Sequence, residues 1–465
     1  MITASHTRRI AEFAAGLKLE DIPQPVIARA KDLILDGLGC GLYGIDLEWT
    51  EILARTVRRL EPGGGQATVW GRGETASAVN AALINGTLVQ GYEMDDAHIG
   101  GALHSCAVVL PAALAAAEYA GAGKVSGGRL LAAIIAGFEI GPRAGMCMRG
   151  ERMSMNGWHS GAIIGPFPAA IAAGIVLGLD SNQLFHALGI AGTQSGGLMA
   201  AQYGSMVKRM QHAKGSQSGL YGALLAAEGF TGIEDVFEQP YGGFCATFSR
   251  GSGEFDLPAL SAGLGERWET LRFTVKTYAC KAQNHAPVNA ISELMAEGLT
   301  ADQVEAITIA ATEAVVRQCG WHPYVPKGLT GAQHHAGFCV AMQLIEGDVF
   351  VDQMVVKNAA RPDLVALANR VRLVRSVERE QKGNEYRHGA DVEVVLKDGR
   401  VLRRTVDHPA GSHQRPLSSE QVVRKFRRLA SKSLPQQRVD EVEGVVRNLE
   451  NLPAAALTRV LHGSG

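Results

Sequence analysis

Roughly the first 265 residues contain long runs of small and apolar residues with almost no charge, and this pattern restricts that part of the chain to buried helices. The clearest runs, in which such residues recur at helical spacing, cover residues 78–89, 108–119, 130–140, 161–177 and 219–229. Helices that are apolar on most sides are buried by other helices. Asp180 or Ser181 is a suitable N-cap for the helix that follows.

The pattern changes near Trp268, where β-prone and alternating segments begin. Predicted strands cover residues 268–275, 304–310, 370–374, 392–396 and 401–406. The last two flank Asp398-Gly399, a strong signal for a β-hairpin. Helices are predicted among these strands and again at the end of the chain, at residues 288–297, 333–345 and beyond Ser418. The fold class is therefore mainly α, with an α+β domain at about 270–404.

Composition disfavours several classes of partner. Hydrophobic residues make up 46% and charged residues 20% of the 465 residues, so the chain can bury a large core. The formal net charge of −1 gives no support for nucleic acid or an anionic membrane as a partner. Seven scattered cysteines without a CxxC pair favour a reducing compartment. The N-terminal segment has no long apolar run, and apolar stretches such as residues 108–117 are too short to cross a bilayer, so we expect a cytoplasmic protein.

The sequence lacks the common motifs for nucleotide binding, for a nucleophilic serine and for a zinc protease. No GxGxxG follows a predicted strand, and neither GxxxxGKS/T, GxSxG nor HExxH occurs. The glycine-rich spots at residues 63–65 and 251–253 are typical of loops. The sequence therefore gives no support for nucleotide binding.

Four polar islands interrupt the apolar sequence and hold the candidate functional residues. They cover residues 92–98 with 103–105, 156–161, 203–209 with His212 and Lys214, and 276–281 with Asn284 and His285. Ionisable side chains are rarely buried without partners, yet these lie between segments that should be buried. If the islands converge, lysine and arginine would neutralise carboxylates and histidine would move protons. We therefore expect a small carboxylic acid as substrate.

Each island also has a structural interpretation. Those interpretations are helix capping by Asp95 and Asp96, a satisfied core position for His159, and a solvated face that includes Lys208 and Arg209. A metal site is a further alternative, with Asp95, Asp96, His98 and His104 as ligands. Its spacing is unfavourable and nearby lysines would repel a cation, so we predict no metal.

At these islands the sequence resembles the MmgE/PrpD family, which includes 2-methylcitrate dehydratase, cis-aconitate decarboxylase and iminodisuccinate epimerase. The resemblance covers essentially the whole chain. Its anchors follow the family's order: Asp95, Asp96 and His104; Gly157-Trp158-His159; residues 204–209 with Gly215 and Gly219; Lys276, Tyr278 and Cys280; and residues 411–426. Each motif alone is weak, but five in order are specific.

The resemblance implies a two-domain architecture. A large helical domain would be built from residues 1–268 and 405–465, and an α+β lid domain would be inserted at residues 269–404. A homodimer without a cofactor is also implied. Carried over by position, the active-site set is Asp95, Asp96, His104, His159, Lys208 and Lys276. Neighbouring candidates for substrate contact are Glu93, His98, Arg209, His212 and Lys281.

Four positions depart from the family's pattern. Glu93 stands where the family usually has Asp, and Ala97 stands where it has Thr. Lys281 replaces the His of the decarboxylases and dehydratases, and Phe338 replaces a Tyr. These changes predict a substrate other than 2-methylcitrate or cis-aconitate. Lys281 would be an additional carboxylate clamp, unless it points to solvent at the domain hinge.

The residue types and the resemblance together predict how the site works. Carboxylates, and the charge that forms when a proton leaves the neighbouring carbon, would be stabilised by Lys208, Lys276 and Lys281. The acid and the base, in an order left open, would be His104 and His159. An imidazole would be oriented by Asp95 or Asp96.

The predicted function is that of a cofactor-independent lyase or isomerase acting on a small di- or tricarboxylic acid. Dehydration is favoured, and epimerisation or decarboxylation on the same scaffold is the alternative. The rival from another class is a non-catalytic carboxylate-binding protein, which Ala97 and Phe338 would favour.

Overall fold

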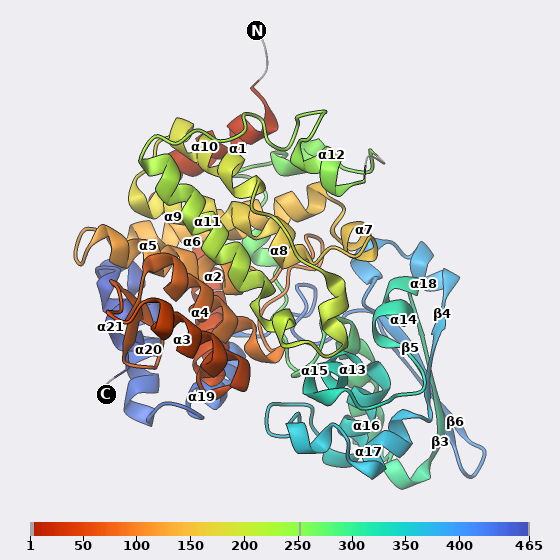
Figure 1. The fold of residues 1–465 in the computed structure, drawn as a ribbon. Helices are drawn as coiled ribbons and strands as arrows, with labels where there is room; N and C mark the ends of the chain where they lie inside the picture. Colours follow the sequence, from red (N-terminus) through yellow and green to blue (C-terminus); the bar gives the residue numbers. More distant parts are fainter. Residues whose placement is uncertain (1–3, 251–252, 464–465) are drawn as a thin grey trace.

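The computed structural model describes residues 4–250 and 253–463, and its larger part is a set of helices packed around α9 (Figure 1). The predicted helical runs form α4 (Ala78–Val89), α5 (Cys106–Ala120), α6 (Gly127–Cys147), α8 (Ser160–Ile164), α9 (Pro166–Leu177) and α11 (Gln211–Ala227). Helix α9 contacts α5, α6 and α11, and α4 contacts α5 and α11. Most side chains of α5 and α9 are buried, as expected for apolar helices covered by other helices.

Local sequence sets the ends of these helices. Asp180 caps α10 (Ser181–Gly192), because its carboxylate accepts the Gln183 N–H at 2.8 Å. The Gln183 side chain in turn accepts the Asp180 N–H at 3.1 Å, which completes a capping box. Asp180 is therefore confirmed as the N-cap.

Glycine lets α11 pack directly on α8 and α9. A Cβ at Gly219 would lie 2.2 Å from the carbonyl oxygen of Pro166, and one at Gly215 would lie 2.7 Å from that of Gly161. A larger residue at either position would force the backbones apart. This close packing brings the start of α11 next to the start of α8, where two candidate histidines lie.

Within the described ranges, α6 is the one helix long and apolar enough to cross a membrane. However, 94% of its apolar stretch is buried inside the protein. Helix α6 contacts α9 and α5 along its length, so it is a core helix of the helical body.

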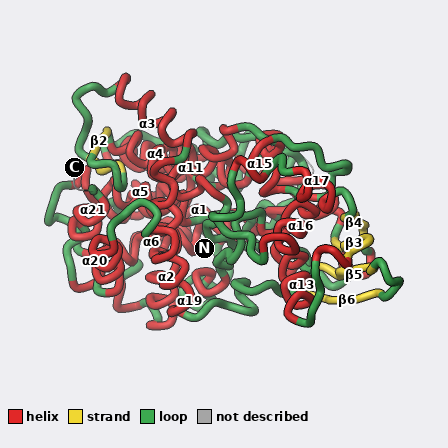
Figure 2. Tube along the Cα trace, turned by 90° about the horizontal axis from the view of Figure 1, so that it is seen from below, coloured by secondary structure: helices red, strands yellow, loops and turns green. Residues whose placement is uncertain are grey.

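Most of the predicted β-structure is confirmed, and it lies at one end of the molecule (Figure 2). The four-stranded sheet has the order β4 (Val371–Arg375), β3 (Val304–Ala311), β5 (Ala390–Leu396), β6 (Val401–Val406). Strands β3 and β4 are parallel, and the other neighbours are antiparallel. The turn at Asp398-Gly399 joins β5 to β6, with Gly399 at φ 88°. A small separate hairpin consists of β1 (Ala67–Val69) and β2 (Glu74–Ala76).

The predicted strand at residues 268–275 is wrong. The segment forms a 3-10 turn at Glu269–Arg272, and only Thr274 makes an isolated bridge, with Ala97. The reason is a side-chain competitor: the Glu139 carboxylate accepts the N–H groups of Glu269 and Thr270 at 2.8 Å each. These donors are therefore not free to join a sheet.

Helices cover the sheet on one side and connect its strands. Helix α13 (His285–Ala296) packs on β5 and β6 and against α16 (Ala336–Glu346). The other helices are α1 (His6–Gly16), α2 (Gln24–Tyr43), α3 (Glu48–Leu60), α7 (Gly150–Met155), α12 (Phe244–Phe248), α14 (Glu313–Cys319), α15 (Gly328–His334), α17 (Pro362–Ala368), α18 (Val377–Gln381), α19 (Ser419–Ala430), α20 (Gln436–Arg447) and α21 (Ala455–Leu461).

The end of the chain returns to the helical body (Figure 1). Helix α19 packs along α2, and a Cβ at Gly39 would lie 3.1 Å from the Cα of Phe426. Lys425 also pairs with the buried Asp36 of α2 at 2.6 Å. The C-terminal helices thus lie beside α2, while the sheet lies at the far end. That the sheet part acts as a lid, and the domain limits at residues 268 and 404, stay predictions.

Candidate active site

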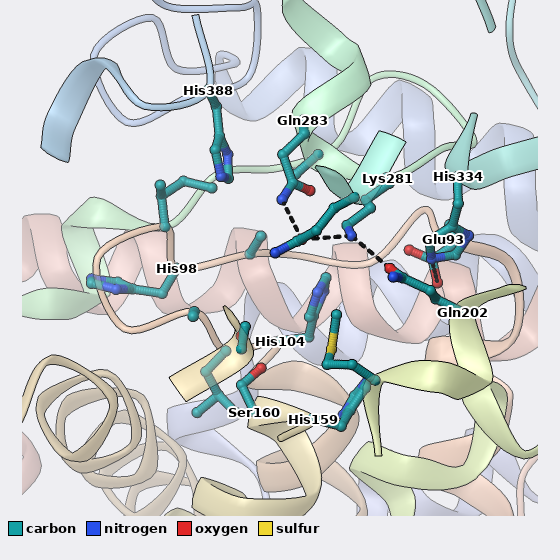
Figure 3. A pocket seen from close by; sticks show the side chains of 18 of the residues that line it. Glu93, His98, His104, His159, Ser160, Gln202, Lys281, Gln283, His334 and His388 are labelled. Atoms are coloured by element: carbon teal, nitrogen blue, oxygen red, sulfur yellow. Dashed lines mark hydrogen bonds and ion pairs between the residues drawn. The ribbon is translucent and has the colours of Figure 1, made fainter. Parts of the chain in front are cut away.

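A cavity of about 110 Å³ lies between the helical body and the α+β part, and all four polar islands reach it (Figure 3). The helical body contributes, among others, Glu93, His104, His159, Lys208 and His212. The α+β part contributes, among others, Lys281, Gln318, His334 and His388. Side chains far apart in the sequence therefore face one small volume.

The first island forms a tight loop between α4 and α5. Glu93 (φ 59°) and Ala102 (φ 51°) have a left-handed backbone, which is uncommon for residues other than glycine. Inside the loop His98 pairs with Leu103 in a short bridge. Such backbone persists where the surrounding structure fixes it, and it is concentrated at functional sites.

Glu93 is the centre of a buried ion-pair cluster. Its carboxylate accepts hydrogen bonds from Lys208 (2.8 Å), Arg209 (3.0 Å) and Lys276 (3.4 Å). The Nε2 atom of His334 lies 3.9 Å away. Burial by itself would raise the pKa of Glu93, but Lys208 and Lys276 outweigh burial and hold the pKa well below its usual range. Glu93 is therefore an anion that orients the ammonium group of Lys208 at the cavity.

Asp95 links this cluster to His104. Its carboxylate lies 3.1 Å from Lys276 Nζ and 3.2 Å from His104 Nδ1. Burial opposes ionisation of Asp95, but the charges of Lys276 and His104 lower its pKa overall. This contact at Nδ1 leaves Nε2 on the other side of the imidazole ring. Of the two aspartates that the sequence left open, Asp95 is thus the one whose carboxylate contacts His104.

Asp96 caps α5 and does not line the cavity. Its two carboxylate oxygens accept the N–H groups of Ser105 (2.8 Å) and Cys106 (3.0 Å) at the start of the helix. Burial, and then the charge of Asp95, raises the pKa of Asp96 to about 6. The structural interpretation of Asp96 therefore describes its contacts best.

His98 is held by its own loop. Its Nδ1 accepts the N–H of Gly101 at 2.9 Å, so its proton lies on Nε2, which is 3.1 Å from the Glu269 carboxylate. Both ring nitrogens are engaged, and the ring lies apart from His104 and His159 (Figure 3). His98 shapes the cavity wall but has no ring nitrogen left for a substrate.

Three imidazoles pack edge to face along one wall. The ring centroids of His104 and His212 are 4.8 Å apart, and those of His159 and His212 are 5.0 Å apart. Among the described residues, neither ring nitrogen of His212 nor Nδ1 of His159 has a hydrogen-bond partner. Burial, reinforced by neighbouring His and Lys side chains, holds the pKa of His159 and of His212 well below the usual range. Both rings are therefore neutral at neutral pH.

Gly161 makes this packing of imidazoles possible. A Cβ at this position would lie 2.1 Å from Cδ2 of His212. A ring cannot tolerate that contact, so any side chain would displace His212 or α8. This is the physical reason for a glycine two residues after His159 in the second island.

Lys281 points into the cavity and not to solvent. Its ammonium group donates hydrogen bonds to Gln318 Oε1 at 2.8 Å and to Gln202 Oε1 at 3.0 Å. Burial is the main cause that lowers its pKa. The predicted clamp position is thus at the cavity wall, and the hinge alternative does not hold.

Four candidates lie behind the wall: Asp95, Asp96, Arg209 and Lys276. Lys276 is fully buried between Asp95 and Glu93, so it acts on the cavity through these carboxylates. The expectation that Lys276 holds a substrate carboxylate directly does not fit this position. The Arg209 guanidinium group donates hydrogen bonds to Thr330 Oγ1 at 3.1 Å and to Gln333 Oε1 at 2.6 Å, both on α15. Arg209 thus connects the helical body to the α+β part.

The departures from the family's pattern have unequal consequences. Ala97 lines the cavity, so the missing hydroxyl changes its surface. Phe338 is buried with its ring centroid 5.1 Å from that of Tyr324, and it does not line the cavity. Phe338 therefore gives no support for a non-catalytic protein.

Sequence reasoning missed several lining residues: Gln202, Gln318, His334, Arg387 and His388. The His334-His335 pair inside an apolar helical run was the available signal, because buried histidine needs a partner. His334 Nδ1 donates to the Thr330 carbonyl at 2.8 Å, which leaves Nε2 facing Glu93. The glutamines carried no signal, since their residue type is common in solvated segments.

The side chains at the cavity suit an anion. Lys208, Lys281 and Arg387 line it, and Glu93 is the carboxylate among the described lining residues. In the described ranges, no group of three or more His, Cys, Asp or Glu side chains is arranged to hold a metal ion. An excess of cations beside neutral imidazoles can bind a small polycarboxylate and transfer a proton to or from it.

Comparison with known proteins agrees with this chemistry. The MmgE/PrpD N-terminal domain matches residues 8–255, and the MmgE/PrpD C-terminal domain matches residues 278–451. The cis-aconitate decarboxylase-like protein oryM of Aspergillus oryzae is 37% identical over 458 residues, which cover 96% of this chain and 94% of that protein. The cis-aconitate decarboxylase of Aspergillus terreus is 36% identical over 460 residues, 96% of this chain and 93% of that protein. The human cis-aconitate decarboxylase is 28% identical over 474 residues, 100% of this chain and 96% of that protein. With both family domains matched in order along nearly its whole length, the chain belongs to the MmgE/PrpD family.

Proposed function

We propose that this chain, a lyase-type enzyme of its family, decarboxylates a small unsaturated tricarboxylic acid of the cis-aconitate type without a cofactor. The observation that carries the proposal is the cavity itself, where lysine and arginine outnumber carboxylates and three imidazoles share one wall. The names of the fungal relatives, which match over almost the full length, support the choice of decarboxylation over dehydration for this proposal.

The reaction requires stabilised negative charge and one proton. In cis-aconitate the carboxylate that leaves as CO₂ is attached to a methylene group next to the carbon–carbon double bond. When that carbon–carbon bond breaks, its electron pair forms a new double bond. The electron pair of the old double bond then takes a proton at the carbon beside a remaining carboxylate. Charge develops on that carboxylate, and ammonium groups at the cavity stabilise it.

His104 is the best placed proton donor. Its Nδ1 atom lies 3.2 Å from the Asp95 carboxylate, which is the arrangement of proton-transferring histidines in other enzymes. His159 and His212 lack such a partner among the described residues, and burial favours their neutral forms. We therefore assign the role of the acid to His104. The neutral rings of His159 and His212 would form hydrogen bonds with the substrate.

Dehydration and epimerisation use the same chemical features, because both also pass through charge beside a carboxylate. The sequence by itself favours dehydration and a substrate other than cis-aconitate, since Lys281 and Ala97 change the lining of the cavity. These alternatives, together with binding without turnover, define the outcomes of the test. We also propose a homodimer, as the resemblance implies, and light scattering after gel filtration measures the assembly. A cytoplasmic location is proposed from the scattered cysteines and the N-terminal segment.

The test is an assay of the purified protein on a panel of acids followed by NMR in deuterated water. We expect cis-aconitate to lose CO₂ and to incorporate one deuteron at the carbon beside a carboxylate. Conversion of 2-methylcitrate or citrate by loss of water would instead establish a dehydratase. Binding of these acids without any reaction or isotope exchange would refute the enzymatic proposal. His104→Gln is the matched variant, because it keeps the polar volume but cannot donate the proton.

A further inference from the structure

Lys281 differs from Lys208, the other lysine among the described lining residues, in its partners. Its ammonium group is held by two neutral amide oxygens, those of Gln202 and Gln318. In the part of the chain that the structure describes, no carboxylate lies within 4.0 Å of this ammonium group. Lys281 is half-buried, and partial removal of an ammonium group from water without a counter-ion is costly, so this group is available for an anion.

Lys208 has a carboxylate partner, because its Nζ atom is 2.8 Å from the Glu93 carboxylate. The guanidinium group of Arg387 is tied to the loop structure: it donates to Asn384 Oδ1 at 3.0 Å and to the carbonyl oxygen of Ile99. Lys281 is thus the lining lysine without a carboxylate partner among the described residues.

Two further contacts fix where Lys281 presents its charge. The Lys281 backbone N–H donates to the Gln333 carbonyl at 3.0 Å, which anchors the start of the side chain. Gln283 Nε2 donates to Gln318 Oε1 at 3.0 Å and so orients the amide that accepts from Lys281. In Figure 3 the ammonium group lies between Gln202 and Gln283, across the cavity from His104 and His159. A carboxylate bound there would present the rest of the molecule to the imidazoles.

We infer that Lys281, positioned by Gln202 and Gln318, forms a separate carboxylate subsite that makes the cavity select tricarboxylates over dicarboxylates. The inference rests on the proposed function for the kind of substrate, but not for the reaction. The amide oxygens hold the ammonium group in place without neutralising it. A substrate with a third carboxylate supplies the missing charge, and a dicarboxylate held elsewhere in the cavity leaves Lys281 unpaired.

Binding of unreactive acids tests the subsite separately from turnover. Tricarballylate is a saturated tricarboxylate, and glutarate is the same carbon chain without the central carboxylate. Isothermal titration should show that wild type binds tricarballylate more tightly than glutarate. In Lys281→Met the Kd for tricarballylate should rise by about tenfold or more, since a charge-assisted hydrogen bond is lost. The Kd for glutarate should change much less.

Three variants serve as checks on that result. Lys281→Arg should restore most of the preference, because it returns the positive charge. Gln318→Glu should reduce the preference as Lys281→Met does, because the new carboxylate occupies the ammonium group from inside the protein. Lys214→Met removes an exposed lysine charge outside the cavity and should bind both acids as wild type does. Near-UV circular dichroism verifies the fold of each variant.

The outcomes separate this inference from the proposed reaction. Lys281-dependent preference for tricarballylate in a protein that does not decarboxylate cis-aconitate would support the subsite and refute the reaction. The subsite would be overturned if Lys281→Met lost affinity equally for tricarballylate and glutarate. It would also be overturned if Lys281→Met and Gln318→Glu kept the wild-type preference for tricarballylate over glutarate. A folded wild type that does not bind tricarballylate would overturn it as well, whatever its activity on cis-aconitate.

Discussion

Replacement of Lys276 by methionine should lower the free energy of unfolding, although Lys276 does not line the cavity. The ammonium group is fully buried, 3.1 Å from Asp95 and 3.4 Å from Glu93. After Lys276→Met, Glu93 still has Lys208 and Arg209, but Asp95 is left with His104 as its partner. Breaking a buried pair at one side costs about 3–5 kcal/mol, because the remaining charge stays buried. Since one of the two carboxylates keeps its cations, we expect a loss near the lower end, about 3 kcal/mol.

A double variant separates the structural effect from the catalytic one. Lys276→Met combined with Asp95→Asn removes both charges, and a neutralised buried pair is often as stable as the original. The free energy of unfolding in urea should return to within about 1 kcal/mol of wild type. Activity should stay about 10²–10⁴-fold low, because His104 has lost the carboxylate that orients it.

The matched control is Lys124→Met, which removes an exposed lysine charge and should leave stability and activity unchanged. The reasoning fails if Lys276→Met unfolds within about 1 kcal/mol of wild type while its activity is lost. That result would mean that Lys276 contacts substrate directly, as the family resemblance alone predicted.

The remaining predictions concern the cavity, its packing and its charges. Lys208→Met should lower turnover by at least about 100-fold because a charge-stabilising donor is lost, with a smaller loss of stability than Lys276→Met; near wild-type turnover would contradict its place at the cavity. Gly161→Ala should strongly reduce activity, because its Cβ would lie 2.1 Å from His212 Cδ2. The control is Gly16→Ala, where an added Cβ would have no neighbouring atom within 4 Å. Normal kinetics for both variants would show that the His212 ring moves freely. Burial raises the pKa of Asp96 to about 6 in the folded protein. The protonated side chain therefore stabilises the fold at a pH below the pKa of Asp in the unfolded chain, and this stability is lost as the pH rises through 6. The unfolding free energy of wild type relative to Asp96→Asn should therefore fall by about 2 kcal/mol between pH 4 and 7, as measured by urea titrations, and a constant difference would refute the shift. Dialysis against a strong chelator should leave activity unchanged, because the lining ammonium groups repel cations, and an activity restored only by a divalent metal would overturn this.

Much of the fold could be predicted because local sequence and burial agree. The residues of α4, in which small and apolar side chains recur at helical spacing, predicted the helix with its observed limits, Ala78–Val89. The alternation in β3 and the Asp398-Gly399 turn predicted strands because side chains alternate across a half-buried sheet. Residues 268–275 failed because the competing partner, Glu139, lies far away in the sequence. Propensity does not register such a partner.

The candidate site divides in the same way. Ionisable residues inside apolar sequence marked Glu93, His104, His159 and Lys208, because burying them requires partners. The same signal could not distinguish Asp95 from Asp96, because the two adjacent residues are of the same type. They differ only in the groups that surround each carboxylate in the folded chain. It also placed Lys276 at the substrate, whereas the structure places it between two carboxylates behind the wall.

By itself, the sequence determined the helical body, the order of the strands along the chain and the chemical character of the site. These properties depend on residue type and spacing, which bury apolar surface and require partners for charges within each segment. The tertiary structure alone decided which side chains meet. Gln202 and Gln318 became the partners of Lys281, and Gly161 admitted the His212 ring, only when segments distant in sequence packed together. The identity of each residue's neighbours sets its charge state and its access to the cavity, and those neighbours come from the packing of the whole chain.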